Sequence, residues 1–275
     1  MNTRGVVTVL QARVGSTRLP GKVLLELGEA TVLEYQIARI RMARLYGQLV
    51  VATTTDPADE AIVAVCEAAR VDYVRGHPTD LLQRHYRVAQ AFGASHVVKI
   101  PSDCPLIDPA VIDLVIGSYL DAAPRRDYVG NLHPESFPDG NDVEIMSVDA
   151  LEIAWREALA PHEREHTTPF LWDQPGRFRL GNVSREGVDL SRAYRYVLDY
   201  AEDHDVIRAI HAALHLRNPR FGVDDIVEFL EAHPDIARRN ARYRGVSWYR
   251  HHPGVLRTVP PSAYLDPSLE VQWTR

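Results

Sequence analysis

Short apolar segments alternate with longer segments of helical periodicity along the first 100 residues of the chain. Buried strands are indicated by short, β-branched apolar runs at residues 6–10, 49–52, 71–74 and 96–100. Helices are predicted by the spacing of apolar side chains at residues 31–45, 56–70 and 80–92. Strands that alternate with helices of this length indicate βαβ units, and therefore an α/β fold with a mostly parallel sheet.

The pattern changes after about residue 120, where residues 124–140 are rich in turn-forming residues. Further strands are predicted at residues 143–146, 177–183 and 194–198, and further helices at residues 149–159, 201–215 and 223–233. From residue 246 the chain has no clear periodicity, but its aromatic residues predict packing against the body or a partner: Trp248, Tyr249, Tyr264 and Trp273. We therefore expect one domain over residues 1–245, with an inserted lobe at about residues 121–185, and a C-terminal extension at residues 246–275.

The composition excludes several classes of protein. Of the 275 residues, 45% are hydrophobic and 25% are charged, as in ordinary globular proteins, and the first apolar run is too short for a signal peptide or a membrane span. Two cysteines, Cys66 and Cys104, provide neither a disulfide framework nor a CxxC metal site, which favours a reducing, cytoplasmic location. The net charge of −6 argues against a nucleic-acid partner, so an anionic ligand requires a local cluster of positive charge.

Such a cluster follows the first predicted strand. Residues 11–22 (QARVGSTRLPGK) combine two glycines with three basic side chains, Arg13, Arg18 and Lys22. Glycine lets backbone N–H groups approach phosphate oxygens, and arginine can bind phosphate through two hydrogen bonds. The loop matches neither the Walker A pattern nor the dinucleotide fingerprint, which disfavours a P-loop kinase and an NAD enzyme. On these residues alone, a phosphate-binding loop and a solvated basic loop both remain open.

Aspartates end two of the predicted strands. Asp103 follows the strand at residues 96–100, and Asp199 ends the apolar run at residues 194–198. In an open α/β sheet, the carboxyl ends of the strands face the ligand crevice, where carboxylates and phosphate oxygens together can hold Mg²⁺. A helix N-cap or a turn is the structural alternative for each aspartate.

Several motifs occur in order along residues 5–210: residues 11–24, Gly76 with residues 80–84 (DLLQR), residues 103–109 (DCPLIDP), residues 137–144 (FPDGNDVE) and residues 163–166 (EREH). In this order they resemble the sugar-acid cytidylyltransferases, above all the spore coat polysaccharide branch, with the 3-deoxy-manno-octulosonate and acylneuraminate enzymes as more distant relatives. The resemblance implies a three-layer α/β/α sandwich of the nucleotide-diphospho-sugar transferase type, which is GT-A-like and Rossmann-like, and a homodimer.

The resemblance also implies an activity, in which CTP and a sugar acid of nonulosonic or octulosonic type give a CMP-sugar and pyrophosphate. It implies that Asp103 and Asp199 hold Mg²⁺, and that Arg13 and Lys22 stabilise the charge of the leaving group. The implied nucleotide-binding residues are Gln11, Ala12, Arg13, Gly15, Ser16, Lys22, Thr53, Arg75 and Arg84. The implied substrate-binding residues are Asp139, Asp142, Glu144, Glu163, Arg164 and His166.

Other interpretations of single motifs stay open at this point. A helix N-cap is an alternative near Thr53, and surface ion pairs are an alternative for Arg75 and Arg84. A glycosyltransferase of the same broad fold holds its metal with a DxD motif, which residues 203–205 match at the start of a predicted helix. A non-catalytic nucleotide-binding scaffold is the third possibility. Residues 162–166 match the zinc-protease pattern HExxH, but flanking prolines disfavour the stable helix that it needs, and we expect no zinc site.

Overall fold

A seven-stranded sheet forms the centre of the computed structural model, which describes residues 3–246, 248 and 254–259. Its strands are β1 (Val6–Gln11), β4 (Gln48–Thr54), β5 (Asp72–Gly76), β6 (His96–Pro101), β7 (Tyr128–Gly130), β8 (Glu144–Ser147) and β9 (Leu180–Asn182). They lie in the order β5-β4-β1-β6-β8-β7-β9, and only β8 runs antiparallel to its neighbours. The predicted mostly parallel sheet is therefore confirmed.

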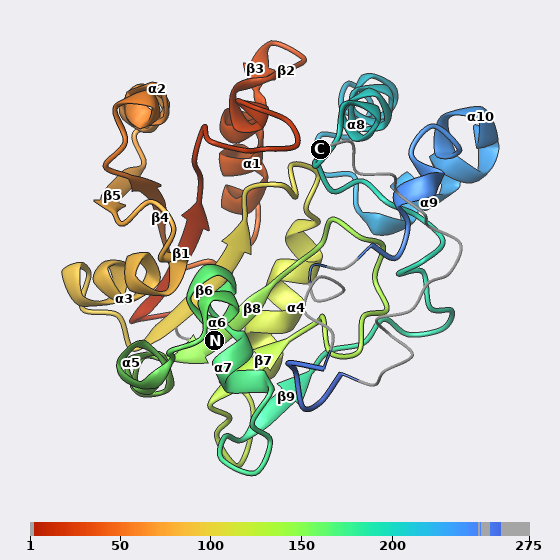
Figure 1. Cartoon of the computed structure of the whole chain (residues 1–275). Coiled ribbons are helices and arrows are strands. Elements are labelled where there is room, and N and C mark those ends of the chain that lie inside the picture. Colours follow the sequence, from red (N-terminus) through yellow and green to blue (C-terminus); the bar gives the residue numbers. More distant parts are fainter. Residues whose placement is uncertain (1–2, 247, 249–253, 260–275) are drawn as a thin grey trace.

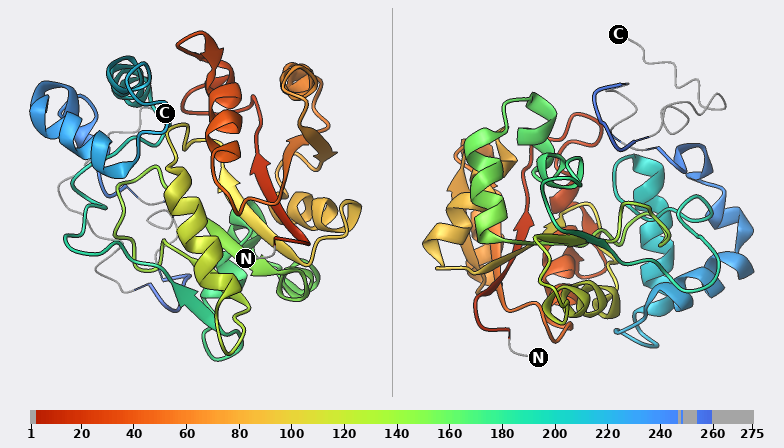
Figure 2. Two further views of the ribbon diagram at one scale, coloured as in Figure 1. Left: turned by 180° about the vertical axis from the view of Figure 1, so that it is seen from behind. Right: turned by 90° about the horizontal axis from the view of Figure 1, so that it is seen from below.

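Helices cover both faces of this sheet (Figures 1 and 2). Successive strand residues point to opposite sides, so apolar strand residues pack against helices on each face. One hydrophobic cluster joins one face to α1 (Val32–Arg41), α2 (Glu60–Ala68) and α4 (Pro109–Leu120). A second cluster joins the other face to α3 (Leu81–Ala91), α5 (Val148–Glu157) and α7 (Pro169–Trp172). This arrangement confirms the predicted α/β/α sandwich.

A third hydrophobic cluster lies beside the sheet. It contains residues of α8 (Ala201–Leu214), α9 (Val223–Ala232) and α10 (Pro234–Ala237), together with the hairpin of β2 (Glu26–Leu27) and β3 (Ala30–Thr31). These three helices group together at one side of the molecule (Figure 1).

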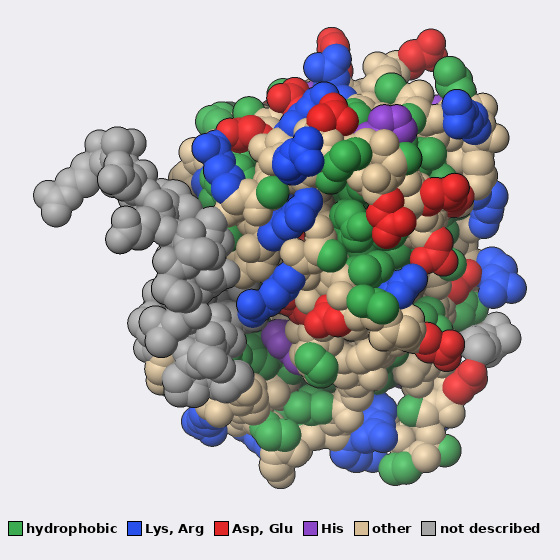
Figure 3. Space-filling model, turned by 90° about the vertical axis from the view of Figure 1, so that its right-hand side faces the viewer, with side chains coloured by type: hydrophobic (Ala, Val, Ile, Leu, Met, Phe, Trp, Pro, Cys, Tyr) green, Lys and Arg blue, Asp and Glu red, His purple; other side chains and the backbone are tan. Residues whose placement is uncertain are grey.

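On the face shown in Figure 3, basic and acidic side chains are intermixed over the surface.

Most predicted elements occur within a few residues of their expected positions, but one predicted strand is wrong and several observed elements, most of them short, were not predicted. The helix α4 and the strand β7 were not predicted. The predicted strand at residues 194–198 is wrong, because this extended segment forms only an isolated bridge, between Arg195 and Asp139. The segment at residues 121–185 supplies β7, β8 and β9 to the central sheet.

Of the aromatic residues expected to pack near the C-terminus, Trp248 is described, and its ring stacks on His166 with centroids 3.9 Å apart. Tyr249, Tyr264 and Trp273 lie outside the described residues. No helix in the described parts of the chain combines the length and the apolar character that a membrane span requires.

A buried arginine connects α1 to two loops on the side of the sheet that carries α4. Arg39 is fully buried, and its guanidinium donates hydrogen bonds to the carbonyls of Leu106 (3.3 Å), Ile107 (3.0 Å), Pro219 (3.1 Å) and Phe221 (2.7 Å). Burial lowers the pKa of Arg39, against the opposing influence of nearby Tyr35. Because the first two carbonyls lie shortly after Asp103, Arg39 also holds the loop that carries this aspartate.

Replacing this arginine tests its contribution to stability. We expect Arg39→Met to lower the free energy of unfolding by about 2–4 kcal/mol, since four carbonyls lose a donor, three of them in buried hydrogen bonds. Urea denaturation followed by tryptophan fluorescence measures the change. Arg208→Met, at an exposed position on α8, is the matched control and should change stability by less than about 0.5 kcal/mol. An unchanged urea midpoint for Arg39→Met would show that these hydrogen bonds are dispensable.

Candidate active site

A cavity of ≈ 560 Å³ lies where β1 and β6 end, and the last residues of both strands, Gln11 and Pro101, line it. This is the edge at which an open α/β sheet binds its ligands. Most of the predicted site residues meet in its lining: Gln11, Ala12, Arg13, Ser16, Lys22, Arg84, Asp103, Asp139, Asp142, Glu144, His166 and Asp199.

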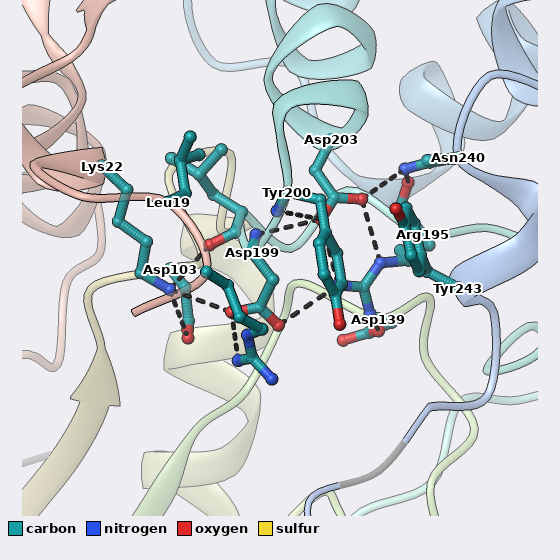
Figure 4. Close-up of polar contacts among 12 residues, drawn as sticks. Leu19, Lys22, Asp103, Asp139, Arg195, Asp199, Tyr200, Asp203, Asn240 and Tyr243 are labelled. Carbon is teal, nitrogen blue, oxygen red and sulfur yellow. Dashed lines mark hydrogen bonds and ion pairs between the residues drawn. The ribbon is translucent and has the colours of Figure 1, made fainter. Parts of the chain in front are cut away.

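The ammonium group of Lys22 lies between the two aspartates that were predicted to hold a metal (Figure 4). Its Nζ is 3.3 Å from Asp103 Oδ2 and 3.0 Å from Asp199 Oδ1, and it donates a hydrogen bond to the Leu198 carbonyl (2.7 Å). Burial alone would lower the pKa of Lys22, but the two carboxylates outweigh burial and raise it. Lys22 is therefore charged, and it neutralises part of the negative charge of the pair.

Asp199 is surrounded by positive charge. Arg18 Nη2 lies 2.7 Å from its Oδ1, and Arg195 Nη2 lies 3.2 Å from its Oδ2. Burial favours the protonated carboxyl, but Lys22, Arg18 and Arg195 outweigh burial and lower the pKa of Asp199 to about 2. This carboxylate is consequently ionised at neutral pH, and both of its oxygens are paired with cationic side chains.

Arg195 is a site residue that the sequence analysis missed. Its side chain is buried and pairs with three carboxylates, at 2.6 Å from Asp139, 3.2 Å from Asp199 and 3.0 Å from Asp203. Asn240 completes the group by donating to Asp203 Oδ1 (2.9 Å). Arg195 lies only four residues before Asp199, and this spacing could have identified it as a site residue. The sequence analysis instead interpreted the segment as a strand.

The DxD motif at residues 203–205 is divided between two different surroundings. Asp203 is buried, and its Oδ2 accepts hydrogen bonds from the backbone N–H groups of Asp199 and Tyr200, which caps the start of α8. Asp205 is exposed on α8, and neither aspartate is part of the cavity lining. The motif therefore serves the start of a helix here, and the two carboxylates do not converge on the cavity.

Acidic side chains from the segment between β7 and β8, and from the first residue of β8, line another part of the cavity. Glu144 is buried, with Lys99 Nζ 2.5 Å from its Oε1 and the Tyr128 hydroxyl donating to its Oε2 (2.7 Å), and Lys99 lowers its pKa against the effect of burial. Burial raises the pKa of Asp139 to about 7, although Arg195 opposes the shift. Burial, followed by the neighbouring Asp139 and Asp103, raises the pKa of Asp142 well above its usual value.

Five predicted site residues lie outside the cavity lining: Gly15, Thr53, Arg75, Glu163 and Arg164. Thr53 is fully buried in β4, and Arg75 donates to the carbonyls of Thr54 and Asp56 and pairs with Glu60. The carboxylate of Glu163 accepts from the backbone N–H of Ala160 at the start of α6 (Pro161–His166), and Arg164 binds Asp80 at the start of α3. Arg75, Glu163 and Arg164 therefore bind other residues of the chain, and Thr53 is part of the buried sheet.

The HExxH pattern lies on α6, a six-residue helix. His162 and His166 both stack on Trp248, with ring centroids 6.3 and 3.9 Å away. Within residues 3–246, 248 and 254–259, no three or more His, Cys, Asp or Glu side chains are arranged to hold a metal ion.

Asp103 and Asp199 nevertheless suit a magnesium ion bound together with phosphate. Both carboxylates already approach one cationic nitrogen, that of Lys22, and both present oxygen, the donor that Mg²⁺ prefers. Mg²⁺ usually takes only one or two carboxylates from a protein when a substrate supplies phosphate oxygens. Asp103 and Asp199 therefore match the one or two carboxylate ligands that a protein supplies to such a magnesium site.

Comparisons with known proteins agree with this geometry. The chain is 28% identical to the spore coat polysaccharide biosynthesis protein SpsF of Bacillus subtilis, over 84% of this chain and 96% of the relative. It is 36% identical to a 3-deoxy-manno-octulosonate cytidylyltransferase of Chlorobaculum parvum, over 75% of this chain and 77% of the relative. The fold superposes on a cytidylyltransferase from Leptospira borgpetersenii with a TM-score of 0.81 and 29% identity, over 85% of this chain and 97% of that one. The cytidylyltransferase family model matches residues 7–230, and the chain belongs to the cytidylyltransferase family.

Proposed function

We propose that this enzyme transfers CMP from CTP to a hydroxyl of a sugar acid, of nonulosonic or octulosonic type, and that the reaction depends on Mg²⁺. The observation that carries the proposal is the convergence of Lys22 with Asp103 and Asp199 at the cavity. A basic side chain for the phosphates and two carboxylates for a metal are the groups that nucleotidyl transfer requires. The match to a 3-deoxy-manno-octulosonate cytidylyltransferase over three quarters of the chain supports the class of acceptor.

The loop after β1 is proposed to bind the triphosphate. Arg13, Ser16 and Lys22 line the cavity from this loop, and Gly21 has a left-handed backbone (φ +70°) in which other residues are strained. Asp103 and Asp199 would hold Mg²⁺, which when bound neutralises charge on the phosphate oxygens. For both to contact the metal, Lys22 and Arg18, which share Asp199 Oδ1, have to exchange their carboxylate partners for phosphate oxygens. In that position Lys22 offsets the charge that develops on the leaving pyrophosphate.

The acidic part of the cavity is proposed to bind the acceptor. Asp139, Asp142, Glu144 and His166 offer groups that can hydrogen-bond to sugar hydroxyls. In the reaction, the acceptor hydroxyl oxygen bonds to the α-phosphorus, the bond to the bridging oxygen of the β-phosphate breaks, and the hydroxyl proton is lost to solvent. The residues of the chain contribute by positioning and by charge neutralisation.

A pyrophosphate-release assay tests the proposed reaction. The protein is incubated with each of the four nucleoside triphosphates, Mg²⁺ and a panel of 2-keto-3-deoxy sugar acids. We expect release with CTP and one class of sugar acid, and none after addition of EDTA. Release that occurs without a sugar acid, with another nucleotide in place of CTP, or in EDTA would contradict the proposal.

Substitution of each carboxylate tests the proposed metal pair. We expect Asp103→Asn and Asp199→Asn to lower kcat by roughly 100-fold or more, because changes even to groups that only support metal ligands cost 10- to 100-fold. Asp205→Asn is the matched control, since this exposed aspartate lies outside the cavity, and its kcat should stay at the wild-type value. Thermal melting of each variant separates lost activity from lost folding. Near-wild-type turnover in either of the first two variants would overturn the metal assignment.

A further inference from the structure

Four aromatic side chains line one part of the cavity and together form an aromatic wall: His133, His166, Trp172 and Trp248. His133 stacks on Trp172 with ring centroids 4.0 Å apart, and His166 stacks on Trp248 with centroids 3.9 Å apart. The two indoles meet edge to face, with centroids 6.4 Å apart. The two stacked pairs are therefore joined into one surface.

The aromatic wall differs in character from the charged parts of the cavity. Trp172 is buried in the hydrophobic cluster that includes α3, α5 and α7. Burial lowers the pKa of His133 to about 4, although Glu144 opposes the shift, so this imidazole is uncharged at neutral pH. Trp248 is partly exposed and lines the cavity. The cavity thus offers charged groups and an apolar surface to the same ligand, as sites for amphipathic small molecules do.

The aromatic wall adjoins the acidic side chains that are proposed to bind the acceptor. Three of its four residues lie within residues 121–185, the segment that also supplies Asp139, Asp142 and Glu144 to the cavity lining. His133 lies near enough to Glu144 for this carboxylate to affect its pKa. The apolar surface therefore belongs to the acceptor side of the cavity.

The fourth member, Trp248, comes from a part of the chain that the family model does not contain. The cytidylyltransferase model ends at residue 230, and the superposition on the Leptospira enzyme covers 97% of that chain but 85% of this one. Gly245 and Val246 line the cavity together with Trp248. The C-terminal extension thus adds its own residues to the site.

Contacts beyond Trp248 hold the C-terminal extension beside the aromatic wall. Asp173, directly after α7, accepts hydrogen bonds from the backbone N–H groups of Arg257 (2.9 Å) and Thr258 (2.7 Å) and from the Thr258 hydroxyl (2.7 Å). Leu256 is buried in the same hydrophobic cluster as Trp172. These contacts fasten the extension to the helix that carries one of the wall's two indoles.

We propose that Trp248, with the rest of the aromatic wall, binds an apolar part of the sugar-acid acceptor, so that the C-terminal extension completes the acceptor subsite and contributes to the choice of acceptor. The inference rests on the proposed function and adds to it a specificity-determining residue from outside the family match. A sugar acid presents C–H groups on the faces of its ring and, in acylated members, an acyl group. Both offer apolar surface to an indole, while the acidic side chains bind the hydroxyls.

The variant Trp248→Ala tests this subsite, because Trp248 is partly exposed whereas Trp172 is part of the core. Isothermal titration calorimetry compares the variant with the wild type for CTP, 3-deoxy-manno-octulosonate and N-acetylneuraminate. The sugar acids are titrated in EDTA with and without CTP, so that no transfer occurs. We expect about a 10-fold loss of affinity for the sugar acid, because the indole contact is lost, and an unchanged affinity for CTP.

The pattern of the loss identifies the apolar group. Weaker binding of the octulosonate assigns a ring face, and weaker binding of N-acetylneuraminate alone assigns the acyl group. Trp248→Phe keeps an aromatic ring and should recover part of the affinity. Trp155→Ala is the matched control, since Trp155 stacks on Tyr86 (4.4 Å between centroids) but lies outside the cavity lining. It should leave all three affinities unchanged, and thermal melting shows that each variant is folded.

Three results would overturn the proposal: wild-type affinity of Trp248→Ala for both sugar acids, an equal loss for CTP, or a wild type that binds neither sugar acid. Pyrophosphate release by the wild type decides the proposed function separately. Turnover of a sugar acid that Trp248→Ala binds as well as the wild type keeps the function and removes the aromatic subsite. Binding that depends on Trp248, without any pyrophosphate release, keeps the subsite and removes the function.

Discussion

The contact of Lys22 with Asp103 and Asp199 is the interaction on which the arrangement of the site depends. Two carboxylates that approach one point repel each other unless a cation lies between them. Lys22 supplies that cation from the loop after β1, and it joins this loop to the end of β6 and to the start of α8. A single ammonium group thus connects three segments of the chain at the cavity.

A second set of charges extends this arrangement toward the rest of the fold. Arg195 binds Asp199, and it also binds Asp203 at the start of α8 and Asp139 in the segment between β7 and β8. On the other side of the loop after β6, Arg39 holds the backbone through carbonyl groups. The two proposed metal ligands are therefore supported by buried arginines that contact several elements at once, which keeps their positions defined.

The sequence predicted the sheet and most helices, because strands and amphipathic helices leave a periodic pattern. It did not predict α4, whose residues are apolar on nearly all sides, so that no helical period is visible. The segment at residues 194–198 looks like a strand because Tyr196 and Leu198 are buried, yet it lies against Asp139 at a single bridge. Motif resemblance located the cavity residues, but single motifs did not distinguish Arg84, which lines the cavity, from Arg75, which pairs within the fold. That distinction depends on tertiary contacts, which no local pattern encodes.

The spacing of the site along the chain also determines when it can form during folding. Lys22 and Asp199 are separated by 177 positions, and Arg18 and Asp199 by 181. Contacts between such distant residues form late, because a long loop has to close before they gain any energy. During synthesis the strands from β1 to β6 can pair while the basic loop still lacks its second aspartate. The cavity therefore assembles only after the start of α8 has been made, and shorter nascent chains carry the basic loop without its Asp199 partner.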